Sequence, residues 1–269
     1  MNNMIFLLET FIKDFKIALS YRLQFFLSIF SVFFSFYFLV IFSSLIDEGA
    51  NSSLVKYGGN YFKFLFFGIL VAEISNILLK TMPDTLRTYQ RTGIFEELML
   101  NGKKEISIIL ASLLYPGFRL FIRVIIYIFL YEFLIYENLL SNLNMISYLS
   151  ILLFVLSLIG ISLIGVAFTI FLKGSAVVPQ MYLMLSSIVC GVAFPIELLP
   201  NILQIISEFF PTTHFLFIIR NNAFEIDSVD ITYRIQALGF LSILFFTLGA
   251  FLVSKAINLS KKNGSLLFY

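Results

Sequence analysis

The sequence is poor in charged residues, histidine and cysteine. Charged residues make up 13% of its 269 residues and hydrophobic residues 59%, whereas soluble domains carry about 25% charged residues. The one cysteine, Cys190, lies in an apolar run, so no disulfide framework can form. The one histidine, His214, cannot build a His-based metal cluster. These shortages exclude an ordinary soluble domain, and we expect no metal site.

Motifs of common enzymes are also missing. Gly102-Lys103 has no glycine five residues before it, so the chain lacks the P-loop that holds ATP. No serine stands in the GxSxG frame of hydrolases. His214 is better read as a helix-start or interface histidine than as a catalytic one. We therefore expect a protein that is not an enzyme, has no cofactor of its own and binds no nucleic acid.

What the sequence has in abundance is long apolar runs. A helix that spans a bilayer needs about 20 apolar residues, whereas a transmembrane β-strand alternates over about ten. The continuous runs predict an all-α integral membrane protein, one domain over residues 1–269, with six transmembrane helices. The runs cover residues 23–46, 61–79, 106–136, 145–172, 176–194 and 235–257.

The distribution of basic residues predicts the orientation. With six spans and the N-terminus in the cytoplasm, the inner side carries many more Lys and Arg residues than the outer side, as the positive-inside rule requires. Both termini and the segment 83–105 are then cytoplasmic. The inner residues are Lys13, Lys16, Arg22, Lys80, Arg87, Arg91, Lys103, Lys104, Lys173, Lys255, Lys261 and Lys262, and the outer ones are Lys56, Lys63, Arg220 and Arg234.

Two segments outside these runs have an amphipathic pattern. Residues 4–21 place Phe11, Phe15 and Ala18 on one helical face, which predicts a helix in the inner interface; a poorly ordered tail is the alternative. Residues 195–220 are framed by prolines and strongly apolar although they lie outside, which predicts a re-entrant hairpin between spans five and six. An ordinary external loop with buried hydrophobic residues is the alternative there.

Four charged residues fall inside the apolar runs away from the ends of the runs: Glu73, Arg119, Arg123 and Glu132. At about 1.5 Å per residue, Glu73 and Arg123 lie about 18 and 20 Å from the outer ends of two antiparallel neighbours. Since charges at such depth pair or face a cavity, we expect a Glu73–Arg123 pair near a transport path or a subunit interface. A purely scaffolding pair is the alternative.

The segment 83–105 is a polar stretch between two apolar runs. Pro83 and Asp84 suit a helix start, and Gly93 and Asn101-Gly102 delimit a short helix between them. Phe95, with Leu98 and Met99, forms its apolar face, which suits docking into a groove on a soluble partner; packing on the chain's own bundle is the alternative. The candidate coupling residues are Arg87, Arg91, Thr92, Gly93, Ile94, Phe95, Glu96, Glu97, Leu98 and Met99.

Three stretches, in this order, resemble the type-2 ABC exporter permeases. RTGIFEELML from Arg91 resembles their RxGTxExL cytoplasmic element, and YFKF from Tyr61, with Gly68, resembles the opening of their second span. The external stretch is similar to their GxxFPxxxLPxxL…PxTxxxxxxR region. Asn101-Gly102, where Ser-Pro or Thr-Pro is frequent, and Lys63, where proline is common, depart from the pattern. The matching external residues are Gly191, Phe194, Pro195, Glu197, Pro200, Pro211, His214 and Arg220.

The resemblance implies a permease subunit of an ATP-binding-cassette exporter in the bacterial cytoplasmic (inner) membrane. Two permease subunits, either two copies or one copy and a paralogue, would enclose the path. Two ATPase subunits would bind ATP and Mg and dock on the coupling helix within residues 83–105, while residues 4–21 would form the connecting helix. The aromatic content suits an amphipathic cargo such as a drug, a lipid-linked molecule or a polysaccharide, and it equally suits a lipid-facing surface. The alternative is an ATP-independent secondary transporter or channel.

Overall fold

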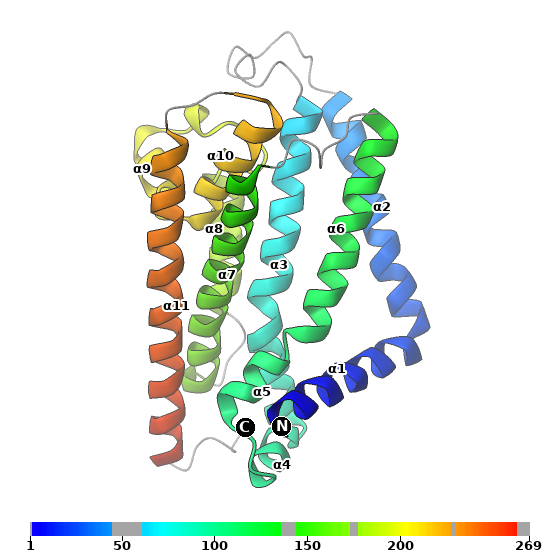
Figure 1. Cartoon of the computed structure of the whole chain (residues 1–269), viewed down its shortest axis with the longest axis vertical. Coiled ribbons are helices and arrows are strands. Elements are labelled where there is room, and N and C mark those ends of the chain that lie inside the picture. Colours follow the sequence, from blue (N-terminus) through cyan, green and yellow to red (C-terminus); the bar gives the residue numbers. More distant parts are fainter. Residues whose placement is uncertain (1, 45–60, 136–143, 173–176, 227–229, 263–269) are drawn as a thin grey trace.

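The computed structural model describes residues 2–44, 61–135, 144–172, 177–226 and 230–262. Over these residues the chain folds into helices and contains no β-strand. The helices α2, α3, α6, α7 and α11 run along the long axis of the molecule (Figure 1). Their bounds are α1 (Asn2–Ser20), α2 (Arg22–Ser44), α3 (Tyr61–Arg91), α4 (Ile94–Leu100), α5 (Glu105–Ala111), α6 (Leu114–Ile135), α7 (Met145–Leu172), α8 (Val177–Val189), the 3-10 helix η3 (Ile196–Leu198), α9 (Asn201–Ser207), α10 (Pro211–Ala223) and α11 (Ile231–Lys262).

Four described helices, α2, α3, α7 and α11, are long and apolar enough to cross a membrane. The all-α membrane class is therefore confirmed at this level, whereas the count of six spans stays a prediction. α6 has 22 residues but carries three charged ones. α8 has 13 residues, or about 20 Å of helix, which is shorter than the hydrocarbon core of about 30 Å.

Two of the expected runs do not form single helices. The run 106–136 is broken between α5 and α6, at Ser112 and Leu113. Pro116 accounts for the break, because it has no N–H to donate to the carbonyl of Ser112, four residues earlier. The run 176–194 ends as a helix at Val189, and Gly191 follows with a left-handed φ of 73°.

The expectation that a helix begins at Pro83 is wrong, because α3 continues through Pro83 to Arg91. An internal proline leaves the carbonyl four residues earlier without its helical donor, which is costly inside a bilayer. Here that carbonyl belongs to Leu79, and it accepts a hydrogen bond of 3.0 Å from the hydroxyl of Ser162 on α7. The apolar span and the first part of the segment 83–105 thus form one continuous helix.

The closest packing joins α7 to α11. A Cβ atom on Gly160 would come within 2.5 Å of the α11 backbone, and one on Gly249 within 2.4 Å of the Gly160 carbonyl oxygen. Small residues at such positions let membrane helices approach backbone to backbone. One hydrophobic cluster around Phe64, Phe154 and Phe215 fills the middle of the bundle. A second cluster, which we call the lower cluster, fills the end that carries α4; it contains Phe6, Met82, Leu86, Tyr89, Phe95, Ile108, Ile109, Leu163, Val166, Ile170 and Val253.

Residues 4–21 form a helix, as predicted, and not an irregular tail. α1 crosses the base of the bundle at the α4 end, and the C-terminal end of α11 lies at that end too (Figure 1). Phe11 and Phe15 contact Tyr115 and Phe118 of α6. The predicted apolar face of α1 therefore packs on α6, although its place in a membrane interface is untested.

Candidate functional site

α4 is the most prominent feature of one end of the molecule. It follows α3 after a turn at Gly93, whose φ is 74°, and it lies at the extreme end of the structure (Figure 1). The carbonyls of Glu97 and Met99 accept the backbone N–H groups that close its C-terminus. The short helix predicted from the turn residues is therefore present with nearly the predicted bounds.

The expected docking role of Phe95 is not supported by its position. Its side chain is only 1% exposed, because it packs into the lower cluster. A short helix can attach to a bundle only through its own apolar face, so the most apolar residue points inward. The exposed residues from Arg91 onward in this segment are Arg91, Thr92, Gly93, Glu96, Glu97, Leu100, Asn101, Gly102 and Lys104.

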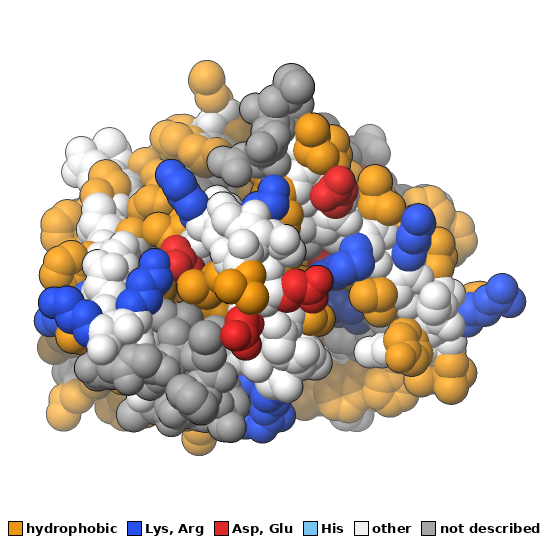
Figure 2. Space-filling view, turned by 90° about the horizontal axis from the view of Figure 1, so that it is seen from below, with side chains coloured by type: hydrophobic (Ala, Val, Ile, Leu, Met, Phe, Trp, Pro, Cys, Tyr) orange, Lys and Arg blue, Asp and Glu red, His pale blue; other side chains and the backbone are white. Residues whose placement is uncertain are grey.

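The exposed surface of this end is mixed in charge. Figure 2 shows Asp and Glu side chains toward the middle of the face, with Lys and Arg side chains spread around them. Leu100, at the end of α4, is 81% exposed, while Leu98 and Met99 are half-buried. Acidic residues beside an exposed leucine on a projecting helix form a compact surface that a soluble partner can recognise.

Two polar contacts fix the surroundings of α4. Lys13 of α1 donates a hydrogen bond of 2.8 Å to the Tyr89 hydroxyl of α3. Lys261 of α11 contacts Glu105, the first residue of α5, at 2.5 Å. Burial alone would raise the pKa of Glu105, but the hydrogen bond and the charge of Lys261 outweigh it and lower that pKa. The segment that holds α4 is therefore tied to the first and the last helices of the described chain.

The predicted pairing of Glu73 with Arg123 is confirmed. The guanidinium of Arg123 forms an ion pair with the Glu73 carboxylate. It also donates hydrogen bonds to the Ser28 carbonyl at 2.7 Å and to the Ser31 hydroxyl at 2.6 Å. The pair thus ties α3 and α6 to α2, which satisfies a charge that would be costly in a bilayer.

The other two charged residues of α6 lie elsewhere along the helix. Arg119, one turn before Arg123, lines a cavity beside α1 and α2. Glu132 lies near the opposite end of α6 and is half-buried.

A polar stripe extends the Glu73 site along α3. Glu73, Asn76 and Lys80 line a groove of about 300 Å³ that Leu183 of α8 borders. Asn76 is exposed within this apolar helix. Polar side chains in a span usually face a partner or a watery cavity, so this groove is a candidate path or subunit contact. Sequence reasoning missed Asn76, although its spacing of three residues from Glu73 was a usable signal.

Arg220 anchors the stretch that follows α8 to α3. Its side chain is 4% exposed, and it donates hydrogen bonds to the carbonyls of Gly191 at 2.6 Å, Phe64 at 3.0 Å and Val192 at 3.1 Å. The guanidinium carbon also lies 3.5 Å from the centre of the Phe64 ring. The arginine thus binds two carbonyls of the non-helical stretch after α8 and one carbonyl in the first turn of α3.

Residues of α3 complete this anchor. The Tyr61 hydroxyl donates a hydrogen bond of 2.8 Å to the Ala193 carbonyl, and a Cβ atom on Gly68 would lie 1.9 Å from the Val192 carbonyl oxygen. Tyr61, Phe64 and Gly68 therefore share the α3 face that meets residues 191–193. Two stretches that were singled out separately in the sequence meet here, through Arg220.

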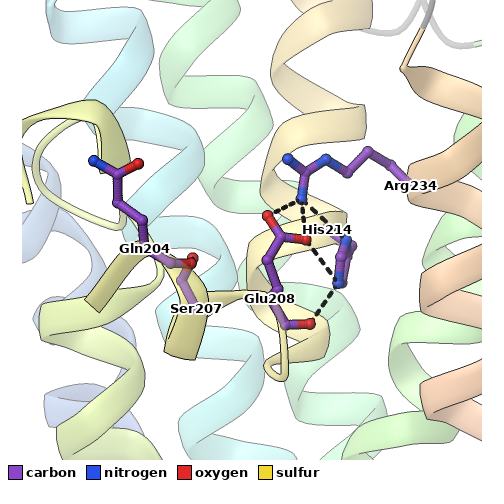
Figure 3. A network of polar contacts seen from close by, with 5 residues as sticks. All are labelled: Gln204, Ser207, Glu208, His214 and Arg234. Atoms are coloured by element: carbon purple, nitrogen blue, oxygen red, sulfur yellow. Dashed lines mark hydrogen bonds and ion pairs between the residues drawn. The ribbon is translucent and has the colours of Figure 1, made fainter. Parts of the chain in front are cut away.

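The predicted hairpin is a bent helix pair. α9 and α10 meet at an angle of 90°. Figure 3 shows the contacts at the bend, where Arg234 of α11 donates hydrogen bonds to both Glu208 carboxylate oxygens at 2.6 and 2.7 Å. His214, which is buried, binds the Glu208 backbone carbonyl through Nε2 at 2.8 Å. His214 is therefore a structural residue of the bend, and Glu208 and Arg234 are partners that sequence reasoning missed.

The prolines of residues 195–220 stand at helix starts. Pro195 precedes η3, Pro200 precedes α9, and Pro211 is the first residue of α10. Phe194 is half-buried between α8 and η3, whereas Glu197 in η3 is exposed. α9 exposes the large apolar side chains of Ile202 and Ile205, and Phe209, two residues after α9, is exposed as well. The predicted proline frame thus defines three short elements.

Comparison of the chain with models of known protein families gave no match, and comparison with curated proteins gave none.

Proposed function

We propose that this chain is the permease subunit of an ATP-binding-cassette exporter in a bacterial inner membrane. Two permease subunits, a pair of copies or a copy and a paralogue, form the translocation path. Two separate ATPase subunits bind ATP and Mg and drive it, and the cargo is amphipathic. α4 is the coupling helix that meets the ATPase, and α1 is the connecting helix.

The observation that carries the proposal is the way α4 is positioned at the end of the bundle and attached to it. It projects beyond the bundle with its polar side and Leu100 exposed, while Phe95 holds it in the lower cluster. α3 leads to it as one continuous helix of 31 residues. A force on α4 is therefore transmitted along α3 into the middle of the bundle. Glu73 and the other residues of the polar stripe, Asn76 and Lys80, lie on this same helix.

The six-span topology is part of the proposal. α6 would be the third span, since Glu73 neutralises Arg123 within it. α8, at about 20 Å, would cross together with residues 190–194, whose carbonyls Arg220 and Tyr61 bind. The α9–α10 pair would re-enter from the outside. Both termini would then be cytoplasmic, and the basic residues near α4 would face the cytoplasm, in accord with the positive-inside rule.

The proposed mechanism has two states. ATP binding closes the ATPase pair and moves α4, which shifts the bundle toward an outward-open state. The size of this shift is set by how much more tightly ATP binds the closed pair than the open pair. The stripe of Glu73, Asn76 and Lys80 would line the path or the contact between the two permeases.

The first test is whether a neighbouring reading frame encodes a Walker-motif ATPase, and the second is co-purification of the full chain with that ATPase. We expect a stable complex that Leu100→Asp weakens at least tenfold, since a charge would replace an apolar contact at the centre of the interface. Phe95→Asp is unsuitable, because a charge in the lower cluster would disturb folding.

The chain offers a matched control in Met145, the first residue of α7, which lies at the opposite end of the bundle. It is 89% exposed, against 81% for Leu100, so Met145→Asp introduces the same charge at a comparably open site. We expect Met145→Asp to keep the complex and ATP-driven transport. If wild-type protein transports cargo without any ATPase, the chain is a secondary transporter or channel and the proposal fails.

A further inference from the structure

A cavity of about 280 Å³ lies where α1, α2, α3 and α6 meet near the α4 end. Its size is close to the lower end of the range of small-ligand pockets, which starts at about 300 Å³. Its lining combines one cation, one anion, aromatic rings and an amide. The residues that the argument uses are Asp14, Tyr21, Gln24, Tyr89, Tyr115 and Arg119.

Arg119 is the feature of this cavity that calls for a ligand. It makes no hydrogen bond or ion pair with any residue that the structure describes, and its Nε is buried without an acceptor. An arginine stays protonated at any physiological pH, and its planar guanidinium suits bidentate oxygen ligands. Arg123, one turn along the same helix, also has a buried Nε without an acceptor, but its terminal nitrogens bind Glu73 and two serines. The contrast indicates that Arg119 binds an anion that does not come from the described chain.

The other lining residues narrow the chemistry of that ligand. Tyrosine hydroxyls, such as those of Tyr21 and Tyr115, donate hydrogen bonds to phosphate oxygens. The Asp14 carboxylate pairs with Lys13 Nζ at 3.2 Å, and its remaining acceptor sites suit a hydrogen bond from a ligand's ammonium group. A ligand with a phosphate and an ammonium group a few bonds apart matches both charges.

The position of the cavity points to the bilayer as the source. It lies at the junction of α1 with α2, and α2 is a candidate membrane span. Gln24 and Ser28 of α2 line the cavity. Beside them, α2 carries a row of exposed apolar side chains along which acyl chains can lie: Leu23, Phe26, Leu27 and Phe30.

We propose that this cavity binds the headgroup of a zwitterionic phospholipid from the inner leaflet. Arg119 holds the phosphate, Asp14 attracts the ammonium group, and the acyl chains run along α2. The bound lipid fills the space between α1 and the spans. The site concerns the lipid around the protein and does not depend on which cargo is exported.

The test measures lipid binding to the purified full chain by native mass spectrometry and by thermal unfolding in detergent. Three probes are compared: dioleoylphosphatidylethanolamine, dioleoylphosphatidylglycerol and inorganic phosphate. We expect the ethanolamine lipid to bind more tightly than the glycerol lipid and to raise the unfolding temperature, and we expect millimolar phosphate not to displace it.

Arg119→Gln is the diagnostic variant. It should weaken binding of the ethanolamine lipid roughly 10- to 100-fold, as expected for the loss of a charge-assisted bidentate contact. Because it removes an unpaired guanidinium, it should unfold at the same or a higher temperature than wild type without lipid. Arg22→Gln removes an exposed positive charge at the start of α2 outside the cavity and should change binding less than twofold.

Three results would overturn the proposal. Equal binding by Arg119→Gln and wild type would show that the guanidinium holds no phosphate. Displacement by inorganic phosphate would make this a site for a soluble anion. The third result is that the glycerol lipid binds more tightly than the ethanolamine lipid and that Asp14→Asn changes neither affinity. Asp14 would then have no role in binding, and the ligand would not be zwitterionic. If Arg119→Gln does not fold, Arg119→Lys replaces it, with a smaller loss of binding expected.

Discussion

The anchor formed by Arg220 gives the sharpest prediction about this protein. The single cysteine, Cys190, is fully buried and directly precedes Gly191, whose carbonyl accepts a hydrogen bond from Arg220. Its thiol is therefore a built-in reporter of local opening at residues 190–193. We expect Arg220→Met to let this segment open far more often while the bundle stays folded.

The expected size follows from the contacts that are lost. Arg220 donates to three carbonyls, and a hydrogen bond from a charged donor contributes about 1.5–3 kcal/mol. The contributions are not additive, and removing the arginine also removes its desolvation cost, so we take a net loss of about 3 kcal/mol. At about 1.4 kcal/mol per tenfold change, the open population rises roughly a hundredfold. Local opening of this kind is what governs access to a buried group.

The assay is the rate of Cys190 modification by a maleimide in detergent, well below the unfolding temperature. Circular dichroism at the helix band checks that the variant is folded. Arg220→Lys should give an intermediate rate, because an ammonium group cannot bind several carbonyls in a planar fork. Arg91→Met, an exposed arginine at the α4 end, is the matched control and should leave the rate unchanged. An unchanged rate in folded Arg220→Met would refute the reasoning.

Three further predictions concern stability. Gly68→Ala should lower the free energy of unfolding by about 1–3 kcal/mol through overpacking, measured by thermal unfolding; an unchanged midpoint would mean that the close backbone contact at this glycine can relax. Single charge reversal at Glu73 or at Arg123 should lower the free energy of unfolding by about 3 kcal/mol or more. The double reversal should recover part of this loss in the same assay, and no recovery would show that the contact is not stabilising. The lowered pKa of Glu105 means that its pairing with Lys261 stabilises the fold above the unfolded pKa, near 4.5, and that this stability is lost as pH falls through the folded pKa. Lys261→Met should lower stability at pH 7 by up to about 1 kcal/mol and flatten that acid dependence, and an unaltered pH profile would contradict the pairing.

Local patterns predicted the short elements of this fold well. Residues 4–21 read as an amphipathic helix because Phe11 and Phe15 recur on one face, and α1 uses those rings against α6. The turn at Gly93 likewise fixed the start of α4. These features depend on neighbours within one or two turns of helix, which is the range that sequence periodicity covers.

Long-range packing reversed two expectations drawn from local rules. Pro83 suggested a helix start, but Ser162 of α7 binds the carbonyl that this proline leaves without a helical donor, so α3 continues. Phe95 suggested a free docking residue, but the lower cluster buries it. In both cases the partner comes from residues that periodicity around the position cannot identify.

The sequence alone determined that this is a helical membrane protein, since its long apolar runs leave few other ways to satisfy the backbone in lipid. It also pointed to Glu73 and Arg123 as partners, because two antiparallel neighbours at matching depth leave little choice. Only the tertiary structure decided that Arg123 pairs with Glu73 while Arg119 lines a cavity, and that Arg220 joins residues 191–193 to α3. The physical reason is that a charged side chain in a span is defined by the atoms brought to it from other helices, and those depend on how the helices pack.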